Sequence, residues 1–245
     1  MADRHAGGRE RIGALTNETT TPSYQDLARM IDYAALAPAF SEEQISHACD
    51  TAKQYEVARL TVRPSDLDMA AAWMKGSGVV LATTVGYPYG TDTTAVKLYA
   101  VRDALGRGAK AIETALNRGK LFSRQFRYLE SELMQMAQEC RRAGAELILD
   151  LELESLPEDL RVIACKIARR TDVHRLRAAS EQDLQYLSSR LEQVEAAAIT
   201  TLPDALRARE LGCAAIQTTD PRPILEAWRA QLTTENAENT ENKKS

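Results

Sequence analysis

The chain has 245 residues, of which 44% are hydrophobic, and its formal net charge is −4. This length and apolar content are enough to bury a substantial core in one domain. Charged residues of both signs make up 27% of the chain, so its composition gives no reason to expect nucleic acid or a membrane surface as a partner. No apolar run approaches the ~18 residues that span a bilayer, and the first residues lack the apolar core of a signal peptide. We therefore expect a cytoplasmic protein.

The cysteines and histidines are too scattered to predict a metal centre. The three histidines lie far apart, and no two cysteines form a C-x-x-C pair. Zinc sites usually draw on ligands at short, regular spacings. The four cysteines are Cys49, Cys140, Cys165 and Cys213. We expect them to be reduced packing residues, and we expect neither a metal nor another cofactor.

The two ends of the chain differ from the rest. Residues 1–22 are polar and aperiodic, and residues 233–245 are polar and of low complexity. Such segments cannot bury apolar area, so we expect disordered tails on either side of a domain over 23–232. Within that domain, β-like runs occur at 29–33, 58–63, 79–85, 110–116, 146–153, 172–178, 196–200 and 213–217.

A helix-like segment follows each of these runs. The clearest are 41–55, 91–106, 122–144, 158–170, 181–193, 203–211 and 221–232. Ser41 has the side chain of an N-cap, and Glu43 and Gln44 fall in the first turn after it. Eight such units indicate a parallel sheet, and the length favours closure into a single-domain (β/α)8 TIM barrel. The alternative is an open doubly wound sheet, which more often has a glycine-rich phosphate turn after its first strand.

The stretch VGYPYGTDTTAVKLYAVRDALGRGAKAIETALNRG (85–119) carries the most specific motif. It resembles the deoxyribose-phosphate aldolase family, in which the third strand and the helix after it read V-G-F-P-x-G-x-x-T-x-x-x-K. The matching residues are Val85, Gly86, Pro88, Gly90, Thr94 and Lys97. Ile31-Asp32, Pro64-Ser65 and Ala164-Cys165 resemble further motifs at a consistent spacing. The resemblance runs from about Ile31 to Leu225 and implies a barrel lyase that forms a Schiff base through a lysine.

The resemblance also implies that this lysine is missing. The family's V-K-T-S-T-G motif on strand six matches residues 174–180, which places Arg177 at the lysine; a register two residues earlier places Arg175 there. A guanidinium stays protonated at physiological pH and is a poor nucleophile. Glu113 takes the place of the family's proton-relay aspartate, and Asp32 matches outright.

The phosphate-binding turns of the family also look altered. Ala197-Ala198 stand where the family has Gly-Gly, and the phosphate turn of strand eight reads as residues 217–220, with Thr218, Thr219 and Asp220. Without glycine the backbone approaches a phosphate less closely, and a carboxylate at Asp220 would repel it.

Strand periodicity, independently of the family, predicts a charged barrel interior. Side chains two apart share a face, which groups Arg59, Thr61 and Arg63; Asp150, Glu152 and Glu154; and Arg175 and Arg177. With Asp32 and Glu113, about four arginines would face about five or six acids. Buried charges at this density must pair, be hydrated or bind an ionic group.

Three interpretations follow: a salt-bridge network in a retired active site, a pocket for a zwitterionic or anionic metabolite held by Arg63 and Arg177, or altered catalysis by Glu113 and Asp32. The candidate catalytic positions are Glu113, Arg177 and Asp32; the candidate substrate-binding residues are Thr61, Arg63, Asp150, Glu152, Arg175, Thr218 and Thr219.

We hypothesise an aldolase-like pseudoenzyme that binds a small charged metabolite or acts as a scaffold. The alternative is an active lyase that cleaves 2-deoxyribose 5-phosphate, or a related substrate, to acetaldehyde and an aldehyde through a displaced nucleophile. We expect a homodimer as the candidate assembly.

Overall fold

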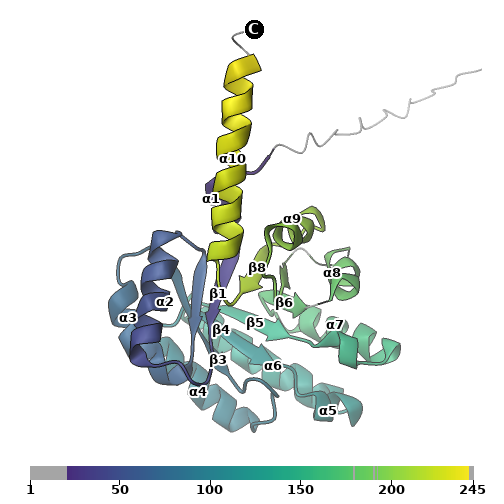
Figure 1. The fold of residues 1–245 in the computed structure, drawn as a ribbon. Coiled ribbons are helices and arrows are strands. Elements are labelled where there is room, and N and C mark those ends of the chain that lie inside the picture. Colours follow the sequence, from purple (N-terminus) through teal and green to yellow (C-terminus); the bar gives the residue numbers. More distant parts are fainter. Residues whose placement is uncertain (1–20, 179, 190, 192, 243–245) are drawn as a thin grey trace, which may run out of the picture.

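Eight parallel strands close into a barrel in the computed structural model, which describes residues 21–242 except 179, 190 and 192 (Figure 1). The strands are β1 (Ile31–Ala35), β2 (Arg59–Val62), β3 (Val80–Val85), β4 (Ala111–Ala115), β5 (Glu146–Asp150), β6 (Arg175–Ala178), β7 (Val194–Ala196) and β8 (Ala215–Thr218). Each strand pairs with its neighbours in sequence, and β8 pairs with β1. The predicted (β/α)8 barrel is confirmed, and the open sheet is excluded because β1 and β8 close the circle.

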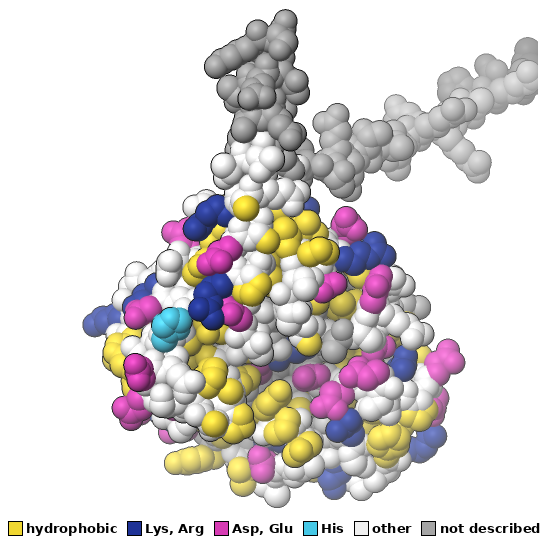
Figure 2. All heavy atoms as spheres, viewed as in Figure 1, with side chains coloured by type: hydrophobic (Ala, Val, Ile, Leu, Met, Phe, Trp, Pro, Cys, Tyr) yellow, Lys and Arg dark blue, Asp and Glu magenta, His cyan; other side chains and the backbone are white. Residues whose placement is uncertain are grey.

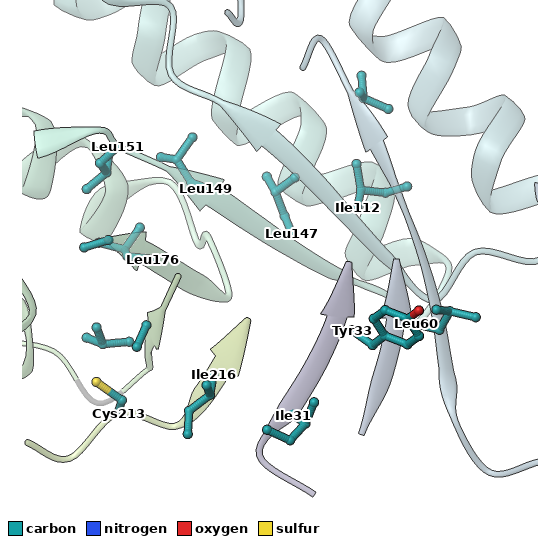
Figure 3. Close-up of a cluster of buried hydrophobic side chains, with 14 of the residues drawn as sticks. Ile31, Tyr33, Leu60, Ile112, Leu147, Leu149, Leu151, Leu176, Cys213 and Ile216 are labelled. Atoms are coloured by element: carbon teal, nitrogen blue, oxygen red, sulfur yellow. The ribbon is translucent and has the colours of Figure 1, made fainter. Parts of the chain in front are cut away.

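Apolar side chains fill the layer between the strands and the surrounding helices. Leu147 and Leu149 project from one side of β5, and Leu176 and Ile112 project into the same layer from neighbouring strands (Figure 3). All four are buried. Burying a side chain of this size contributes about 1.5–3 kcal/mol, so this outer layer is the main source of stability. The barrel interior is therefore free to hold residues of a different kind.

Ten helices lie among the described residues. They are α1 (Tyr24–Ala28), α2 (Glu42–Gln54), α3 (Leu67–Met74), α4 (Thr94–Gly106), α5 (Arg118–Phe122), α6 (Phe126–Arg142), α7 (Glu158–Arg170), α8 (Glu181–Ser188), α9 (Leu202–Glu210) and α10 (Arg222–Asn242). The N-cap predicted at Ser41 is confirmed: its hydroxyl accepts from the Gln44 amide, and the Gln44 side chain accepts from the Ser41 amide. Among these helices, none combines the length and apolar character needed to cross a membrane.

Two of the predicted strand boundaries that differ from the structure affect the interior. Strand β5 ends at Asp150 and does not continue to 153, because Glu152 has a φ of 43° and turns the chain into a short 3-10 helix, Leu153–Ser155. Strand β7 covers Val194–Ala196, whereas the prediction was 196–200. There the positive φ of Ala198, 58°, ends the extended backbone. Both corrections change which acidic side chains face the interior.

The C-terminal helix α10 is longer than the sequence predicts. It continues to Asn242 and projects from the barrel (Figure 1), so residues 233–242 are helical where a disordered tail was expected. The hydroxyls of Thr233 and Thr234 donate to the carbonyls one turn earlier, and no proline or glycine interrupts the segment. The expected tail residues 1–20 and 243–245 lie outside the described residues.

The loop after β3, which carries the family-like motif, requires a glycine at position 90. Gly90 has a φ of +67°, and a Cβ there would lie 2.3 Å from the carbonyl oxygen of Ala115. Any other residue would clash with the backbone at the end of β4 as well as strain its own. The loop therefore packs directly on the end of the neighbouring strand β4.

Exposed ion pairs connect neighbouring helices on the outside of the barrel. Arg107 of α4 contacts Asp68 of α3 at 2.8 Å, and Arg102 of α4 contacts Glu139 of α6 at 2.8 Å. Figure 2 shows acidic and basic side chains interspersed among apolar ones on one face. Solvent screens the charges of such pairs, so these contacts add little stability beside the apolar layer.

Candidate functional site in the barrel interior

The barrel interior combines long charged side chains with very small ones. By strand alternation, Ala82 of β3 and Ala111 of β4 face inward, where they form a small apolar cluster with Ile148 of β5. Alanines at these positions leave volume that two arginines, Arg59 and Arg177, occupy. The sequence thus makes room for guanidinium groups where barrels usually pack branched apolar side chains.

Arg177 of β6 lies at the centre of the interior with only 3% of its side chain exposed. Its Nε donates to Glu195 Oε1 at 2.6 Å, its Nη1 donates to Glu113 Oε2 at 2.7 Å, and its Nη2 lies 2.5 Å from Glu195 Oε1. The amide oxygen of Gln217, when oriented toward the guanidinium, accepts from both Nη atoms at 3.0 Å. Asp32 Oδ2 lies 3.8 Å from Nη2. All three guanidinium nitrogens are therefore engaged.

Arg59 of β2 forms a second buried centre below Arg177. Its Nη1 donates to Asp32 Oδ2 at 2.9 Å and lies 3.6 Å from Glu195 Oε2. Its Nη2 donates to Glu146 at the start of β5. Arg175 Nη1 approaches Glu195 Oε2 at 3.4 Å. Three arginines and five acids, counting Asp150, thus face one another, where the sequence predicts about four and five or six.

Thr61 joins the two halves of this network. Its hydroxyl lies 2.6 Å from Glu113 Oε1 and 3.1 Å from Asp32 Oδ1. A hydroxyl has one proton, so both contacts are favourable only when one carboxyl carries a proton itself. Burial raises the pKa of Asp32 to about 7, although Arg59 acts in the opposite direction. Burial also disfavours the charge on Glu113, but Arg177 outweighs it and lowers the Glu113 pKa. Of these two carboxyls, Asp32 is therefore the one that is protonated more readily.

We call the end of the barrel at which the strands finish its mouth. Among the interior acids, Asp150 lies nearest the mouth. It ends β5 and is partly buried, and its Oδ1 accepts from the Glu152 amide at 3.2 Å. Burial raises its pKa to about 6 against the opposing effect of Arg177. The phenol of Tyr87, 47% exposed, has a pKa raised first by burial and then by the Asp150 carboxylate. Asp150 and Tyr87 thus form the polar surface that a molecule entering the mouth would meet.

The raised pKa of Asp150 predicts a pH-dependent stability. Between about pH 4 and 6 the unfolded chain ionises this carboxyl while the folded chain keeps it protonated, so the free energy of unfolding falls as pH rises. The Asp150→Asn variant lacks this loss. We expect its stability relative to wild type to increase by about 2 kcal/mol from pH 4 to pH 7.5, measured by urea unfolding.

Glu146 provides a control of opposite sign. Burial opposes its charge, but His174 and Arg59 outweigh it and lower its pKa to about 2. Its ionised form stabilises the fold above the unfolded pKa, and that contribution is lost as pH falls toward 2. Over the same pH range the stability of Glu146→Gln relative to wild type should therefore decrease. A constant difference between Asp150→Asn and wild type would show that Asp150 is not perturbed.

Two residues predicted to face the barrel interior form their side-chain contacts outside it. Arg63 donates to backbone carbonyls within residues 37–40 and to Asp66 at 2.5 Å, so it holds the loop after β1 and does not reach the interior. Glu152 pairs with Arg118 at the start of α5, because its left-handed backbone turns it away from the face of Asp150. The prediction that both share the interior face is wrong. Each lies beyond the end of its strand, where the alternation stops.

The end of β8 also differs from a phosphate turn. Thr218 is buried, and its hydroxyl accepts from the Asp220 amide and donates to the Asp220 carbonyl. Thr219 is exposed. Asp220 pairs with Arg222 at 2.7 Å, and its pKa is lowered mainly by that hydrogen bond. The repulsion expected from Asp220 is therefore partly neutralised by its own neighbour.

The sequence does not identify three members of the network: Glu195, Glu146 and Gln217. Glu195 is fully buried between two apolar neighbours of β7, a pattern that indicates an inward acid once the strand is placed at 194–196. Within the described residues, no His, Cys, Asp and Glu side chains group in a way that could hold a metal ion. The interior carboxylates face arginines instead.

Comparison with known proteins gives a consistent family. No family model matches the chain. A deoxyribose-phosphate aldolase of Clostridium perfringens is 31% identical over 147 residues, which are 60% of this chain and 65% of the relative. The match thus spans just under two thirds of that relative's length. A deoxyribose-phosphate aldolase of Clostridium kluyveri is 29% identical over 205 residues, covering 78% of this chain and 93% of the relative.

Solved structures agree on the fold. The deoxyribose phosphate aldolase of Aeropyrum pernix, described as a unique tetramer, superposes with a TM-score of 0.78 at 21% identity. The superposition covers 85% of this chain and 93% of that one. The likeness supports the barrel and the order of its elements.

Proposed function

Because the chain belongs to the deoxyribose-phosphate aldolase family, we propose that it is a barrel of that family which lacks Schiff-base activity and binds a small charged metabolite at its mouth. The central observation is the bonding of Arg177. By resemblance, this is the position of the family's nucleophilic lysine. A lysine there must lose its proton to attack a carbonyl carbon.

Arg177 cannot take over that step. Burial alone would favour its neutral form, but Glu113 and Glu195 outweigh burial and raise the pKa of Arg177 well above its usual value. The guanidinium has no free lone pair, and its donors are occupied by carboxylates and an amide. The group therefore acts as a fixed positive charge that holds four strands together.

The described lysines offer no clear replacement. Lys97 is the buried one, and it extends from α4 behind β3, where Nζ donates to Glu132 Oε1 at 2.7 Å. That bond ties the amine to a carboxylate between α4 and α6, away from the interior network. The remaining described lysines are exposed or partly exposed. A Schiff base would require one of them to reach the mouth.

The mouth supports binding of a small molecule with a donor group. Asp150 presents a carboxyl that burial keeps partly protonated, and Tyr87 presents a phenol beside it. Such a pair can accept from an amine or hydroxyl and donate to an oxygen. Amino acids and hydroxy acids fit this description.

The proposal is tested by trapping with borohydride and by ligand stabilisation. We incubate the protein with 2-deoxyribose 5-phosphate, reduce it with borohydride and map adducts by mass spectrometry, while acetaldehyde release reports turnover. We expect no lysine to be modified above the level of exposed Lys53 and Lys166, and no turnover.

In a thermal-shift screen of amino acids, carboxylates and phosphates, wild type should be stabilised by an amino or hydroxy acid, and Asp150→Asn should not.

The Clostridium perfringens relative, treated identically, serves as the positive control for trapping. A stoichiometric adduct on one lysine, or release of acetaldehyde, would establish the alternative of an active lyase with a displaced nucleophile. Equal stabilisation of wild type and Asp150→Asn by the same compound would disprove binding at the mouth.

A further inference from the structure

A cavity of about 340 Å³ opens at the floor of the barrel, at the end opposite the mouth. It lies where the chain enters β6 and β7. Its polar wall consists of Arg169, His174, Arg175 and Gln193, and its apolar wall includes Val173 and Leu191. Figure 1 shows α7 and α8 beside this part of the barrel. The volume falls within the range of small-molecule sites, about 300–1,000 Å³.

The polar wall carries donors that the fold does not use. Arg175 is only 13% exposed, and its Nε is buried without a hydrogen-bond partner among the described residues. This nitrogen is screened from solvent, so it shows that the Arg175 guanidinium is incompletely paired and is not itself a contact for a ligand. Arg169, at the end of α7, is exposed at the rim of the same cavity. Gln193 adds an amide.

The acids near this wall are already paired. Glu146 accepts from Arg59 and lies 3.1 Å from His174 Nε2. Glu195 is held closely by Arg177 and only weakly by Arg175, at 2.6 Å and 3.4 Å. The donors of Arg169 and Arg175 that face the cavity are thus not matched by free carboxylates among the described residues. An anion in the cavity would supply acceptors for the exposed donors of Arg169 and Gln193, and the charge of Arg175 in the wall would attract it.

We propose that this floor cavity binds the phosphate group of a small organic phosphate ester. Arginine forks match the oxygens of a phosphate and bind it through paired charge-assisted hydrogen bonds. The apolar wall of Val173 and Leu191 suits the carbon portion of the ester. The site does not depend on the function proposed for the mouth, which lies at the other end of the strands.

Isothermal titration calorimetry of the full chain tests this site with two probes, glycerol 3-phosphate and inorganic phosphate, at constant ionic strength. We expect saturable binding of both, with glycerol 3-phosphate the tighter. Arg169→Gln should weaken both about tenfold or more, because it removes a charge-assisted contact at the exposed rim without altering the interior. Arg175→Gln should weaken them as well.

Arg170→Gln is the matched control, since Arg170 is the next residue of α7 but pairs with Glu130 at 3.2 Å on the side facing α6. It should bind both probes as wild type does. Absence of saturable binding in wild type, or equal weakening by Arg169→Gln and Arg170→Gln, would overturn the proposal. Tighter binding of inorganic phosphate than of the ester would overturn the role of the apolar wall.

Discussion

Replacing Arg177 with methionine should lower the free energy of unfolding by about 3–5 kcal/mol at pH 7, because it removes the shared counterion of two buried carboxylates. Glu113 and Glu195 are 1% and 0% exposed, and both bond directly to this guanidinium. Methionine has a similar volume, so the loss reflects charge more than a cavity. Chemical denaturation followed by far-UV circular dichroism measures it.

An exposed arginine provides the control for this substitution. Arg207→Met removes pairs to Glu181 and Glu210 on the surface, where solvent screens the charges, so it should change the free energy of unfolding far less than Arg177→Met. If Arg177→Met does not accumulate as folded protein, the combined variant with Glu195→Gln should fold, because one unpaired carboxylate is then neutral. A loss below 1 kcal/mol for Arg177→Met would show that the network contributes little to stability.

The mutual dependence of Arg177 and Glu195 explains why the interior looks rebuilt. They are direct partners in the register between β6 and β7. The resemblance implies that Arg177 stands at the position of the family's lysine; an arginine there needs a carboxylate within reach, and the neighbouring strand supplies it. The alanines of β3 and β4 then leave room for the longer guanidinium groups. A single change from lysine to arginine would not produce this arrangement.

Much of the site could be predicted because strand alternation is a strict period of two. Once the strands are placed, Arg59 and Thr61 must face the same side, and so must Arg175 and Arg177. The apolar residues between them fix which side is the interior. This reasoning needs no knowledge of the family, and it places Glu113 and Asp150 correctly as well.

The site residues that the sequence places wrongly or leaves out depend on where the strands begin and end, which alternation does not specify. Glu152 continues the pattern of Asp150 in sequence, but its φ of 43° removes it from the sheet. Arg63 likewise continues the pattern of β2, yet the carbonyls of the β1 loop take its donors. Glu195 belongs to β7, which begins two residues before the predicted strand at 196–200, so the predicted strand does not include it. Local backbone conformation decides each case.

A second buried pair, Lys97 with Glu132, should contribute comparably to stability. Both side chains are at most 2% exposed, and Glu132 also accepts from the hydroxyls of Thr94 and Tyr128 at 2.8 and 3.3 Å. The side chain of Lys97 passes close to Gly86: a Cβ atom on residue 86 would lie 3.0 Å from Lys97 Cε. Lys97→Met leaves an unpaired buried carboxylate, so we expect a loss of about 3–5 kcal/mol in thermal and urea unfolding.

The double variant Lys97→Met with Glu132→Leu separates the cost of an unpaired charge from the value of the pair. With both charges gone, the site is apolar and of similar volume, so stability should return to within about 1–2 kcal/mol of wild type. The hydroxyls of Thr94 and Tyr128 can bond to each other at 3.0 Å. If the double variant is as unstable as Lys97→Met, the loss comes from packing around Gly86 rather than from the charge. A structural role for Lys97 also requires that its substitution leave ligand binding at the mouth unchanged once the protein is folded.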